Sequence, residues 1–260
     1  MTILSAAAAT AQEELLVQST TSTEASGLYD HILPMFADAT GITVNVVAVG
    51  TGQAIENASN CDGDLLLVHA RAQEERFVAD GLGVERFNLM YNDFVIVGPA
   101  ADPAGIAGMT DAQAALARIA DAQATFASRG DGSGTHAAEM TLWEGAGIDP
   151  AEASGAWYRE AGSGMGATLN TAIGMEAYAL SDRATWISFA NKSDFAIHVE
   201  GDADLFNQYG VVLVNPERCP DVNAAAGQSF IDWLLSEQGQ NAIASFQISG
   251  EQLFFPNAGD

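Results

Sequence analysis

Four clusters of serine, threonine and glycine stand directly before predicted helices, and three of them follow a predicted strand. They occupy residues 19–23, 50–53, 128–136 and 162–166. Their hydroxyl groups, and the N–H groups at the start of each helix, donate hydrogen bonds, while glycine allows the backbone to approach a ligand closely. Such donors, at the positive end of a helix dipole, suit a small and fully ionised oxyanion.

Each cluster alone has an ordinary explanation, because Ser and Thr are common N-caps of helices. The clusters recur, however, twice in each of the two domains that the sequence predicts. In a parallel α/β sheet, turns of this kind lie together at the carboxyl edge of the strands, where ligands bind. The repetition therefore favours an anion-binding function over simple capping.

Charged side chains near these clusters could complete such a site. Arg129 is the strongest candidate, because a guanidinium holds an oxyanion through two parallel hydrogen bonds. His136, in the first turn of its helix, could donate from one ring nitrogen or pack as a capping residue. Asp131 either orients Arg129 or is an ordinary loop acid. His69 is interpreted as a packing or supporting residue, and Arg183 as a weaker ligand candidate.

The first part of the chain predicts the elements that position these residues. Strands are expected at 14–19, 42–49 and 65–68, with helices between them and another at 71–80, the pattern of a parallel sheet with crossover helices. Two more strands are expected at 84–90 and 93–98. The turn-rich segment 98–105 then marks a boundary.

The rest of the chain predicts a second α/β unit. Helices are expected at 110–121, 133–145, 165–174 and 181–190, with strands at 124–128 and 176–180. One strand at 211–214 and helices at 222–236 and 238–246 are too few to form a domain alone. The prediction is therefore a lobe 1 made of 13–98 plus 208–260, with a lobe 2 of 99–207 inserted into it.

The composition limits the function classes. The 260 residues are 48% hydrophobic and 17% charged, which indicates a globular core. With 34 acidic and 9 basic residues the net charge is −25, so nucleic acids and anionic membrane surfaces are not expected partners. Such acidic surfaces are common in proteins that stay soluble in salty media. An anion site in this chain must therefore include one of its few arginines.

The N-terminus and the cysteines bear on export. Residues 1–12 are Ala-rich and end in a small-x-small pattern, which we interpret as the remnant of a secretory signal peptide, the alternative being a disordered tail. Cys61 and Cys219 are 158 residues apart, a spacing that does not make a metal site. An exported protein allows a disulfide between them, but the sequence leaves the pairing open.

These segments together resemble the tungstate-binding proteins of tungstate ABC importers, a branch of the type II periplasmic binding proteins. The resemblance covers nearly all of residues 15–248. It rests on the segments 19–22, 49–54, 68–70, 90–99, 128–136 and 164–168 and on the pair Asp182-Arg183. Ser19 replaces the first threonine of the family motif and keeps its hydroxyl.

The resemblance implies an α/β fold of two lobes joined by a hinge, each a mainly parallel sheet flanked by helices, with the ligand in the interlobe cleft. It implies a periplasmic, monomeric receptor that delivers tungstate to an ABC importer permease with its ATPase, with no cofactor and no catalysis. It also implies that the oxyanion is bound by Thr20, Thr21, Ser22, Thr51, Arg129, Ser133, His136 and N–H groups near Gly166.

Several alternatives stay open. Molybdate, sulfate and phosphate share most of this chemistry, and Asp131 would suit the proton that phosphate keeps near neutral pH. A ligand sensor that is not coupled to transport fits the same residues. An enzyme fits poorly, because the chain has no P-loop and no G-x-S-x-G turn, and its G-x-G-x-x-A match at 162–167 does not follow a convincing strand.

Overall fold

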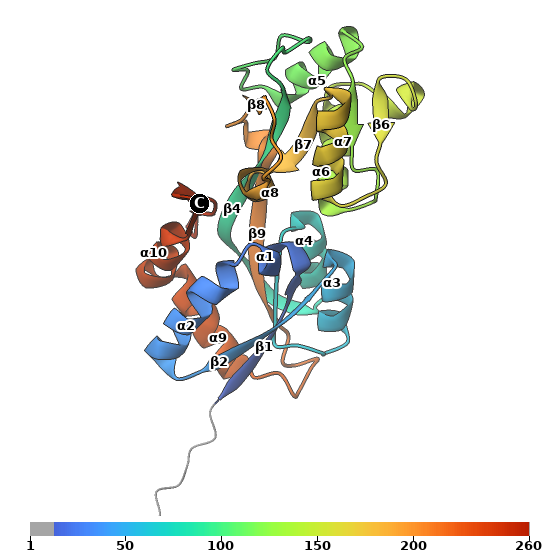
Figure 1. Cartoon of the computed structure of the whole chain (residues 1–260). Helices are drawn as coiled ribbons and strands as arrows, with labels where there is room; N and C mark the ends of the chain where they lie inside the picture. The colour runs from blue at the N-terminus through green and yellow to red at the C-terminus, as the bar shows by residue number, and fades with distance from the viewer. Residues whose placement is uncertain (1–12, 260) are drawn as a thin grey trace, which may run out of the picture. The chain divides into compact units, whose positions relative to one another are not determined.

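The computed structural model describes residues 13–259, so the predicted signal remnant at 1–12 lies outside the described residues. Contacts between Cα atoms divide the chain into two compact units (Figure 1). Unit 1 runs to Met90 and includes Tyr209–Phe246 and the end of the chain from Pro256, whereas unit 2 comprises Tyr91–Gln208 and Gln247–Phe255. The lobe boundaries after residues 98 and 207 stay a prediction beside this division.

Unit 1 is built on a mainly parallel sheet. Strands β1 (Glu14–Thr20), β2 (Thr43–Val49) and β3 (Leu65–Val68) run in the same direction, and β9 (Phe206–Val214) pairs antiparallel with β3. The helices of this unit are α1 (Thr21–Ala25), α2 (Leu28–Thr40), α3 (Thr51–Ser59), α4 (Arg71–Ala79), α9 (Ala224–Leu235) and α10 (Glu237–Ser245).

Both faces of the unit 1 sheet are covered. All four residues of β3 are buried, as expected for a central strand between two helical layers. On one face Leu66 and Val68 pack with Ala54 of α3 and Phe77 of α4. On the other face Gly227 lets α9 approach closely, since a Cβ there would lie 2.6 Å from Leu213.

The strands of unit 2 pair in both directions. Strands β7 (Ala179–Asp182) and β8 (Phe195–Val199) each pair antiparallel with β4 (Gly83–Pro99) and so run parallel to each other. Strands β5 (Phe126–Ser128) and β6 (Tyr158–Glu160) pair in parallel. The helices are α5 (Ala112–Asp121), α6 (Gly134–Gly145), α7 (Met165–Met175) and α8 (Arg183–Ser188), and the remaining short elements are η1 (Pro150–Ala153), η2 (Ala203–Leu205), β10 (Gln247–Ile248), β11 (Glu251–Gln252) and β12 (Phe255–Pro256).

The core of unit 2 has two layers, one on each face of its sheet. Phe126 and Tyr158 belong to a cluster with residues of α5 and α6. Ala127, from the opposite face of β5, packs with Met165 of α7 and Trp186 of α8. This alternation along β5 follows from the period of two in a strand. It places the start of α6 and the start of α7 on opposite sides of the same strand end.

Strand β4 corrects one prediction. Residues 84–90 and 93–98 were predicted as two strands, but Gly83–Pro99 form one continuous strand. In the structure the Asp93 carboxylate is bound by Arg183, and Tyr91 stacks between Phe206 and Phe255 at centroid distances of 4.6 and 5.2 Å. These partners are distant in sequence and allow the strand to continue.

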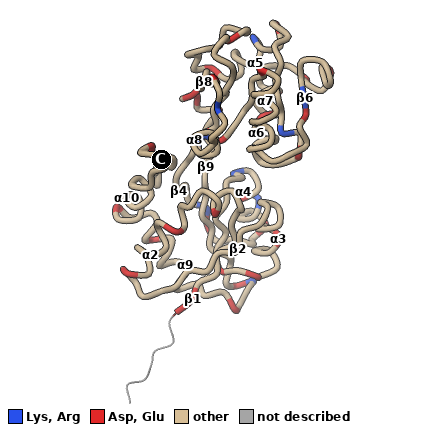
Figure 2. The backbone as a smooth tube through the Cα atoms, in the orientation of Figure 1, with Lys and Arg blue, Asp and Glu red and all other residues tan. Residues whose placement is uncertain are grey.

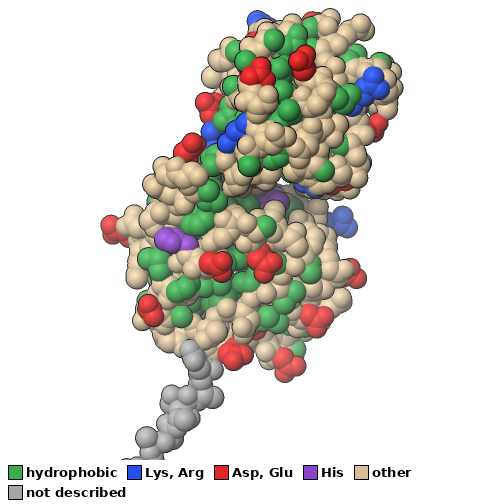
Figure 3. All heavy atoms as spheres, in the orientation of Figure 1, with side chains coloured by type: hydrophobic (Ala, Val, Ile, Leu, Met, Phe, Trp, Pro, Cys, Tyr) green, Lys and Arg blue, Asp and Glu red, His purple; other side chains and the backbone are tan. Residues whose placement is uncertain are grey.

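The excess of acidic residues is visible along the backbone of both units (Figure 2). Acidic side chains are scattered over the face shown in Figure 3, with few basic ones among them. Burying charge is costly, so most of these carboxylates stay in water. Among the described residues, no helix is both long and apolar enough to cross a membrane.

Candidate functional site

In unit 1 the polar clusters meet at one edge of the sheet. Thr20 pairs with Val49 in the register of β1 and β2, so the two strands end at the same level. Helix α1 begins directly after Thr20 and α3 begins at Thr51. We call Thr20, Thr21, Ser22 and Thr51 the hydroxyl edge. The sequence predicted this grouping from the carboxyl ends of parallel strands.

The hydroxyl edge is partly bonded to itself. Thr20 is 3% exposed, and its Oγ1 lies 3.1 Å from Ser22 Oγ and 3.3 Å from His69 Nε2. Ser22 Oγ lies 3.2 Å from the same His69 nitrogen. Thr20 also caps α1, because its Oγ1 accepts the Thr23 N–H at 3.4 Å. His69, interpreted from sequence as a supporting residue, thus contacts two hydroxyls of this edge.

Thr51 lies in a different local setting. The N-cap of α3 is Gly50, which has no side chain to accept a hydrogen bond from the first turn. The Ala54 N–H bonds to Gly50 O at 2.9 Å, as in a regular helix start. The preceding N–H groups of the first turn point out of the N-terminus and are available to a ligand or to water. Thr51 itself is half-buried beside them.

In unit 2 the other two clusters are hydrogen-bonded to each other. Ser128 pairs with Glu160 in the parallel register of β5 and β6, so these strands also end together. Beyond the strand ends, the Ala161 N–H donates to Ser128 O at 2.9 Å and the Ser163 N–H donates to Arg129 O at 3.3 Å. The segment Arg129–Ser133, which we call the arginine loop, therefore lies beside the turn that starts α7.

Arg129 forms a salt bridge with one acid, and one of its donor groups has no partner among the described residues. Its NH2 group donates to Asp131 Oδ2 at 2.6 Å, and the two side chains are 19% and 21% exposed. The other Asp131 oxygen accepts the Ser133 N–H at 3.1 Å. The Nε of Arg129 is buried and has no hydrogen-bond partner among the described residues. A buried guanidinium N–H without a partner is uncommon and marks a place for an acceptor.

These contacts change the pKa of the Asp131 carboxyl. Burial acts to raise its pKa, but the hydrogen bonds from Ser133 and the contacts with Arg129 together outweigh burial, so the pKa is lowered. Asp131 is therefore ionised at neutral pH. Of the two roles considered from sequence, the geometry supports the one in which Asp131 orients Arg129.

Ser133 and His136 organise the start of α6. Ser133 is the N-cap, and its Oγ accepts the His136 N–H at 3.3 Å. The ring of His136 accepts the Gly132 N–H at Nδ1, over 3.0 Å. In the neutral imidazole the proton therefore sits on Nε2, which leaves Nε2 as a donor. Both residues have a structural role here. The Ser133 hydroxyl is also hydrogen-bonded to Asp131, whereas His136 keeps Nε2 as a donor for a ligand.

Gly166 lies in the first turn of α7. The N-cap of this helix is Gly164, so no side chain caps it. The Ala167 and Thr168 N–H groups bond back to Gly164 O at 3.1 and 3.0 Å. A Cβ placed on Gly166 would meet nothing within 4 Å, so the helix start opens onto free space. This is a second helix N-terminus at the arginine loop's edge of unit 2.

Arg183 is fully engaged elsewhere. Its Nε donates to Asp93 Oδ1 at 2.7 Å, and its NH2 contacts the second Asp93 oxygen and, at 2.8 Å, Glu200. The hydrogen bond to Asp93 is the main cause that raises the pKa of the guanidinium. Since two carboxylates occupy this guanidinium, we leave Arg183 out of the site. Asp182, beside it, caps α8 by accepting the Thr185 N–H at 2.8 Å.

Arg159 was not among the candidates that the sequence indicated. Arg159 of β6 also has a buried Nε without a hydrogen-bond partner among the described residues. It pairs with Ala127 in the register of β5 and β6. Its neighbours in sequence, Tyr158 and Glu160, form no motif, so only the strand register reveals its place near the strand end. No group of three or more His, Cys, Asp or Glu residues in the described part of the chain could hold a metal ion.

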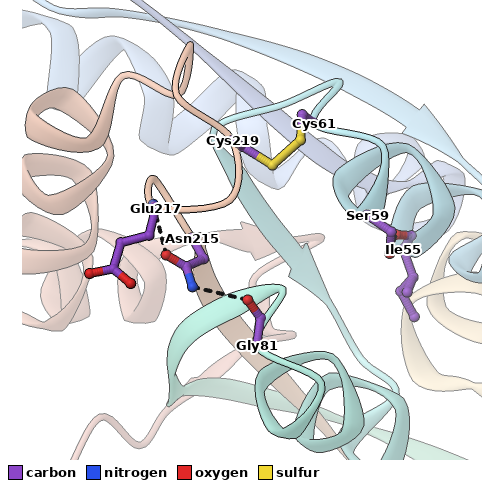
Figure 4. Close-up of a disulfide and its surroundings, with 7 residues drawn as sticks. All are labelled: Ile55, Ser59, Cys61, Gly81, Asn215, Glu217 and Cys219. Carbon is purple, nitrogen blue, oxygen red and sulfur yellow. Dashed lines mark hydrogen bonds between the residues drawn. A yellow bond between two sulfur atoms is a disulfide. The ribbon is translucent and has the colours of Figure 1, made fainter.

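The two cysteines are joined. Cys61, after α3, and Cys219, after β9, form a disulfide with their Cα atoms 5.4 Å apart (Figure 4). Nearby, the Asn215 side chain donates to Gly81 O at 3.0 Å and accepts the Glu217 N–H at 3.0 Å. The pairing that the sequence left open is thus present in unit 1. It connects the two stretches of chain that make up this unit.

Comparisons with known proteins agree with this architecture. A model of the PBP superfamily domain matches residues 5–238. The tungstate-binding protein TupA of Peptoclostridium acidaminophilum is 45% identical over 252 residues, which cover 95% of this chain and 87% of that protein. These matches confirm the resemblance that the motifs indicated.

Solved structures give the same answer. The tungstate-binding protein TupA from Desulfovibrio alaskensis G20 is similar at 47% identity with a TM-score of 0.90, over 95% of this chain and 99% of that one. The structure of the tungstate ABC transporter from Geobacter sulfurreducens is similar at 46% identity and a TM-score of 0.78, over 91% of this chain and all of that one. The predicted α/β fold is confirmed, and the chain belongs to the PBP superfamily and, within it, to the family of the tungstate-binding protein TupA.

Proposed function

We propose that this protein is the solute-binding component of an ABC importer and that its ligand is tungstate. The carrying observation is Arg129, whose buried Nε has no acceptor among the described residues and whose loop adjoins two helix N-termini. Charged donors and helix N-termini in one place are the usual means of holding an oxyanion. The names of the relatives support tungstate as the particular oxyanion.

Each unit, taken by itself, offers donors of the kind that an oxyanion needs. The hydroxyl edge supplies hydroxyls and the open start of α3, and the arginine loop supplies Arg129 with the starts of α6 and α7. The members are those expected from the sequence: Thr20, Thr21, Ser22, Thr51, Arg129, Ser133, His136 and the N–H groups near Gly166. All of them donate, which suits an anion that carries no proton of its own.

The arginine loop favours a fully ionised anion over phosphate. Asp131 would be the acceptor for a phosphate proton, but its two oxygens already accept from Arg129 and Ser133. Tungstate, molybdate and sulfate remain compatible with these contacts, and the resemblance selects tungstate among them.

We propose an extracytoplasmic location, the periplasm in the prediction from sequence. The disulfide between Cys61 and Cys219 supports it, because such bonds persist in oxidising compartments. The partners would be a membrane permease with its ATPase, to which the receptor delivers the anion as a monomer. Light scattering of the purified protein, with and without tungstate, tests the monomer.

Isothermal titration calorimetry on anion-stripped protein tests the ligand. Tungstate is titrated first, and molybdate, sulfate and phosphate are then used as competitors. The expected result is one tight site for tungstate that sulfate and phosphate do not displace, with the molybdate competition giving the selectivity. Absence of heat and of competition with all four anions would refute the proposed ligand.

A further inference from the structure

Glu139 is a buried acid that the proposed site does not use. It lies in α6, one turn beyond His136, and is 1% exposed. The Tyr158 hydroxyl donates to its Oε1 at 2.7 Å, and Trp143 Nε1 donates to the same oxygen at 3.2 Å. The Ser128 hydroxyl is a further hydrogen-bond partner. Buried carboxylates normally pair with a cation, so this environment is unusual.

A short path of hydrogen bonds connects Glu139 with the arginine loop. Ser128 is fully buried, and its Oγ accepts the Gly130 N–H at 3.1 Å. Gly130 has a φ of +58°, and a Cβ there would lie 2.8 Å from the Cβ of Glu160. This bend directs the chain from Arg129 toward the start of α6. Glu139 thus stands two hydrogen bonds away from the backbone that shapes the loop.

Few groups lie close enough to Glu139 to affect the protonation of its carboxyl. Tyr158 comes from β6, Ser128 from β5, and Trp143 and His136 from α6 itself; of these only His136 can carry a positive charge. Burial raises the pKa of the Glu139 carboxyl, and the hydrogen bonds of Tyr158, Ser128 and Trp143 offset this effect only in part.

Other elements that pack on α6 add no near cation. Helix α5 contacts α6, and its charged residues Arg118 and Asp121 are exposed. Strand β7 also contacts α6 and ends in Asp182, which caps α8. The carboxyl of Glu139 is therefore a buried acid that is linked to the arginine loop through Ser128.

We propose that Glu139 is a positioning residue of the anion site, which holds the arginine loop through Ser128 and takes up a proton from solvent when the oxyanion binds. This inference rests on the proposed function. An anion beside Arg129 adds negative charge near the Glu139 carboxylate and so favours its protonated form. Linkage is reciprocal, so protonation of Glu139 must strengthen anion binding, and affinity must fall as pH rises.

Calorimetry with tungstate in two buffers of different ionisation enthalpy measures the protons taken up per anion bound. Experiments from about pH 4 to 8 cover the ordinary carboxyl range and the range above it, toward which the pKa of Glu139 is raised. The wild type is expected to take up a fraction of a proton. Glu139→Gln, which keeps the side-chain shape, should lose most of this uptake and show a flatter pH profile of Kd. Glu139→Leu, which removes the acceptor of Ser128, should weaken tungstate binding roughly 10-fold.

Glu144→Gln is the matched control, because Glu144 is an exposed acid of the same helix, and it should leave both quantities unchanged. A wild type that does not bind tungstate refutes the proposed function itself. A folded Glu139→Gln protein with wild-type uptake and pH profile overturns only the present inference. If the Gln variant does not fold, Tyr158→Phe removes one donor to the carboxylate. The midpoint pH of uptake should then rise, and an unchanged midpoint overturns the inference.

Discussion

The hydroxyl edge of unit 1 and the arginine loop of unit 2 offer donors of different kinds. At the hydroxyl edge, Thr20, Ser22 and His69 lie within 3.1 to 3.3 Å of one another, so neutral groups satisfy each other before a ligand arrives. In the arginine loop, a charged group keeps a buried Nε without a partner. Charged hydrogen bonds are stronger than neutral ones, and no internal bond is lost when this Nε binds. An anion should therefore gain more from the donors of the arginine loop than from those of the hydroxyl edge.

The largest expected effect is at Arg129. Arg129→Ala removes a charged hydrogen-bond donor worth about 1.5–3 kcal/mol, so the Kd for tungstate should rise roughly 10- to 150-fold. Arg129→Lys keeps the charge but lacks the planar pair of donors, so its Kd for tungstate should lie between those of the wild type and Arg129→Ala. Arg118→Ala is the charge-matched control, since Arg118 is exposed on α5. Equal affinities for Arg129→Ala and the wild type would reverse the ranking of the two units.

Thr51→Val and Thr20→Val separate binding from capping in unit 1. Each removes one neutral donor worth about 0.5–1.5 kcal/mol, so the Kd should rise about 2- to 12-fold. Thr20 caps α1, and its change should also lower the free energy of unfolding by about 1 kcal/mol. Thr51 caps no helix, so its change should leave stability within about 0.5 kcal/mol. Calorimetry measures the Kd, and urea unfolding measures the free energy of unfolding. A loss of stability without a change in Kd would show that these residues have a structural role and do not bind the anion.

A further comparison concerns the buried acids, Glu74 in unit 1 and Glu139 in unit 2. Burial raises the pKa of both carboxyls, but Glu74 contacts Arg86 at 2.6 Å, whereas Glu139 has only neutral hydrogen-bond donors. A raised pKa means that the folded state binds the proton more tightly. The stability due to Glu139 is thus present below its unfolded pKa and is lost as pH rises through its folded pKa.

Urea unfolding of the anion-free protein at a series of pH values measures how its free energy of unfolding depends on pH. Glu139→Gln should flatten the decline in the free energy of unfolding with rising pH. Glu74→Gln should instead lower stability at every pH, because it leaves the buried guanidinium of Arg86 without its carboxylate. Parallel pH profiles for the wild type and Glu139→Gln would contradict the raised pKa.

Local sequence was sufficient for most of the framework. The β-branched run at 43–49 and the apolar run at 65–68 became β2 and β3, and the segment expected at 133–145 became α6, which begins after its Ser133 cap. Hydrophobic periodicity and capping depend on neighbours in sequence, so they can be recognised without a structure. The convergence of Thr20 and Thr51 followed from the rule that parallel strands share a carboxyl edge.

What could not be predicted depends on distant partners. The single strand β4 requires Arg183 beside Asp93, 90 positions away. The same pairing occupies Arg183, which looked like a ligand candidate, whereas the buried Nε of Arg129 has no partner among the described residues. Neither the disulfide nor the Glu139–Tyr158 contact has a local signature. Each of these pairings joins side chains that are distant in sequence and meet only in the folded chain.

The disulfide of unit 1 also gives the molecule a closed covalent path. The ring from Cys61 to Cys219 contains the whole segment Tyr91–Gln208, which is nearly all of unit 2. A protease that cuts one loop of that segment therefore opens the ring without releasing a fragment. The two pieces should migrate as one species on a non-reducing gel and separate only after reduction.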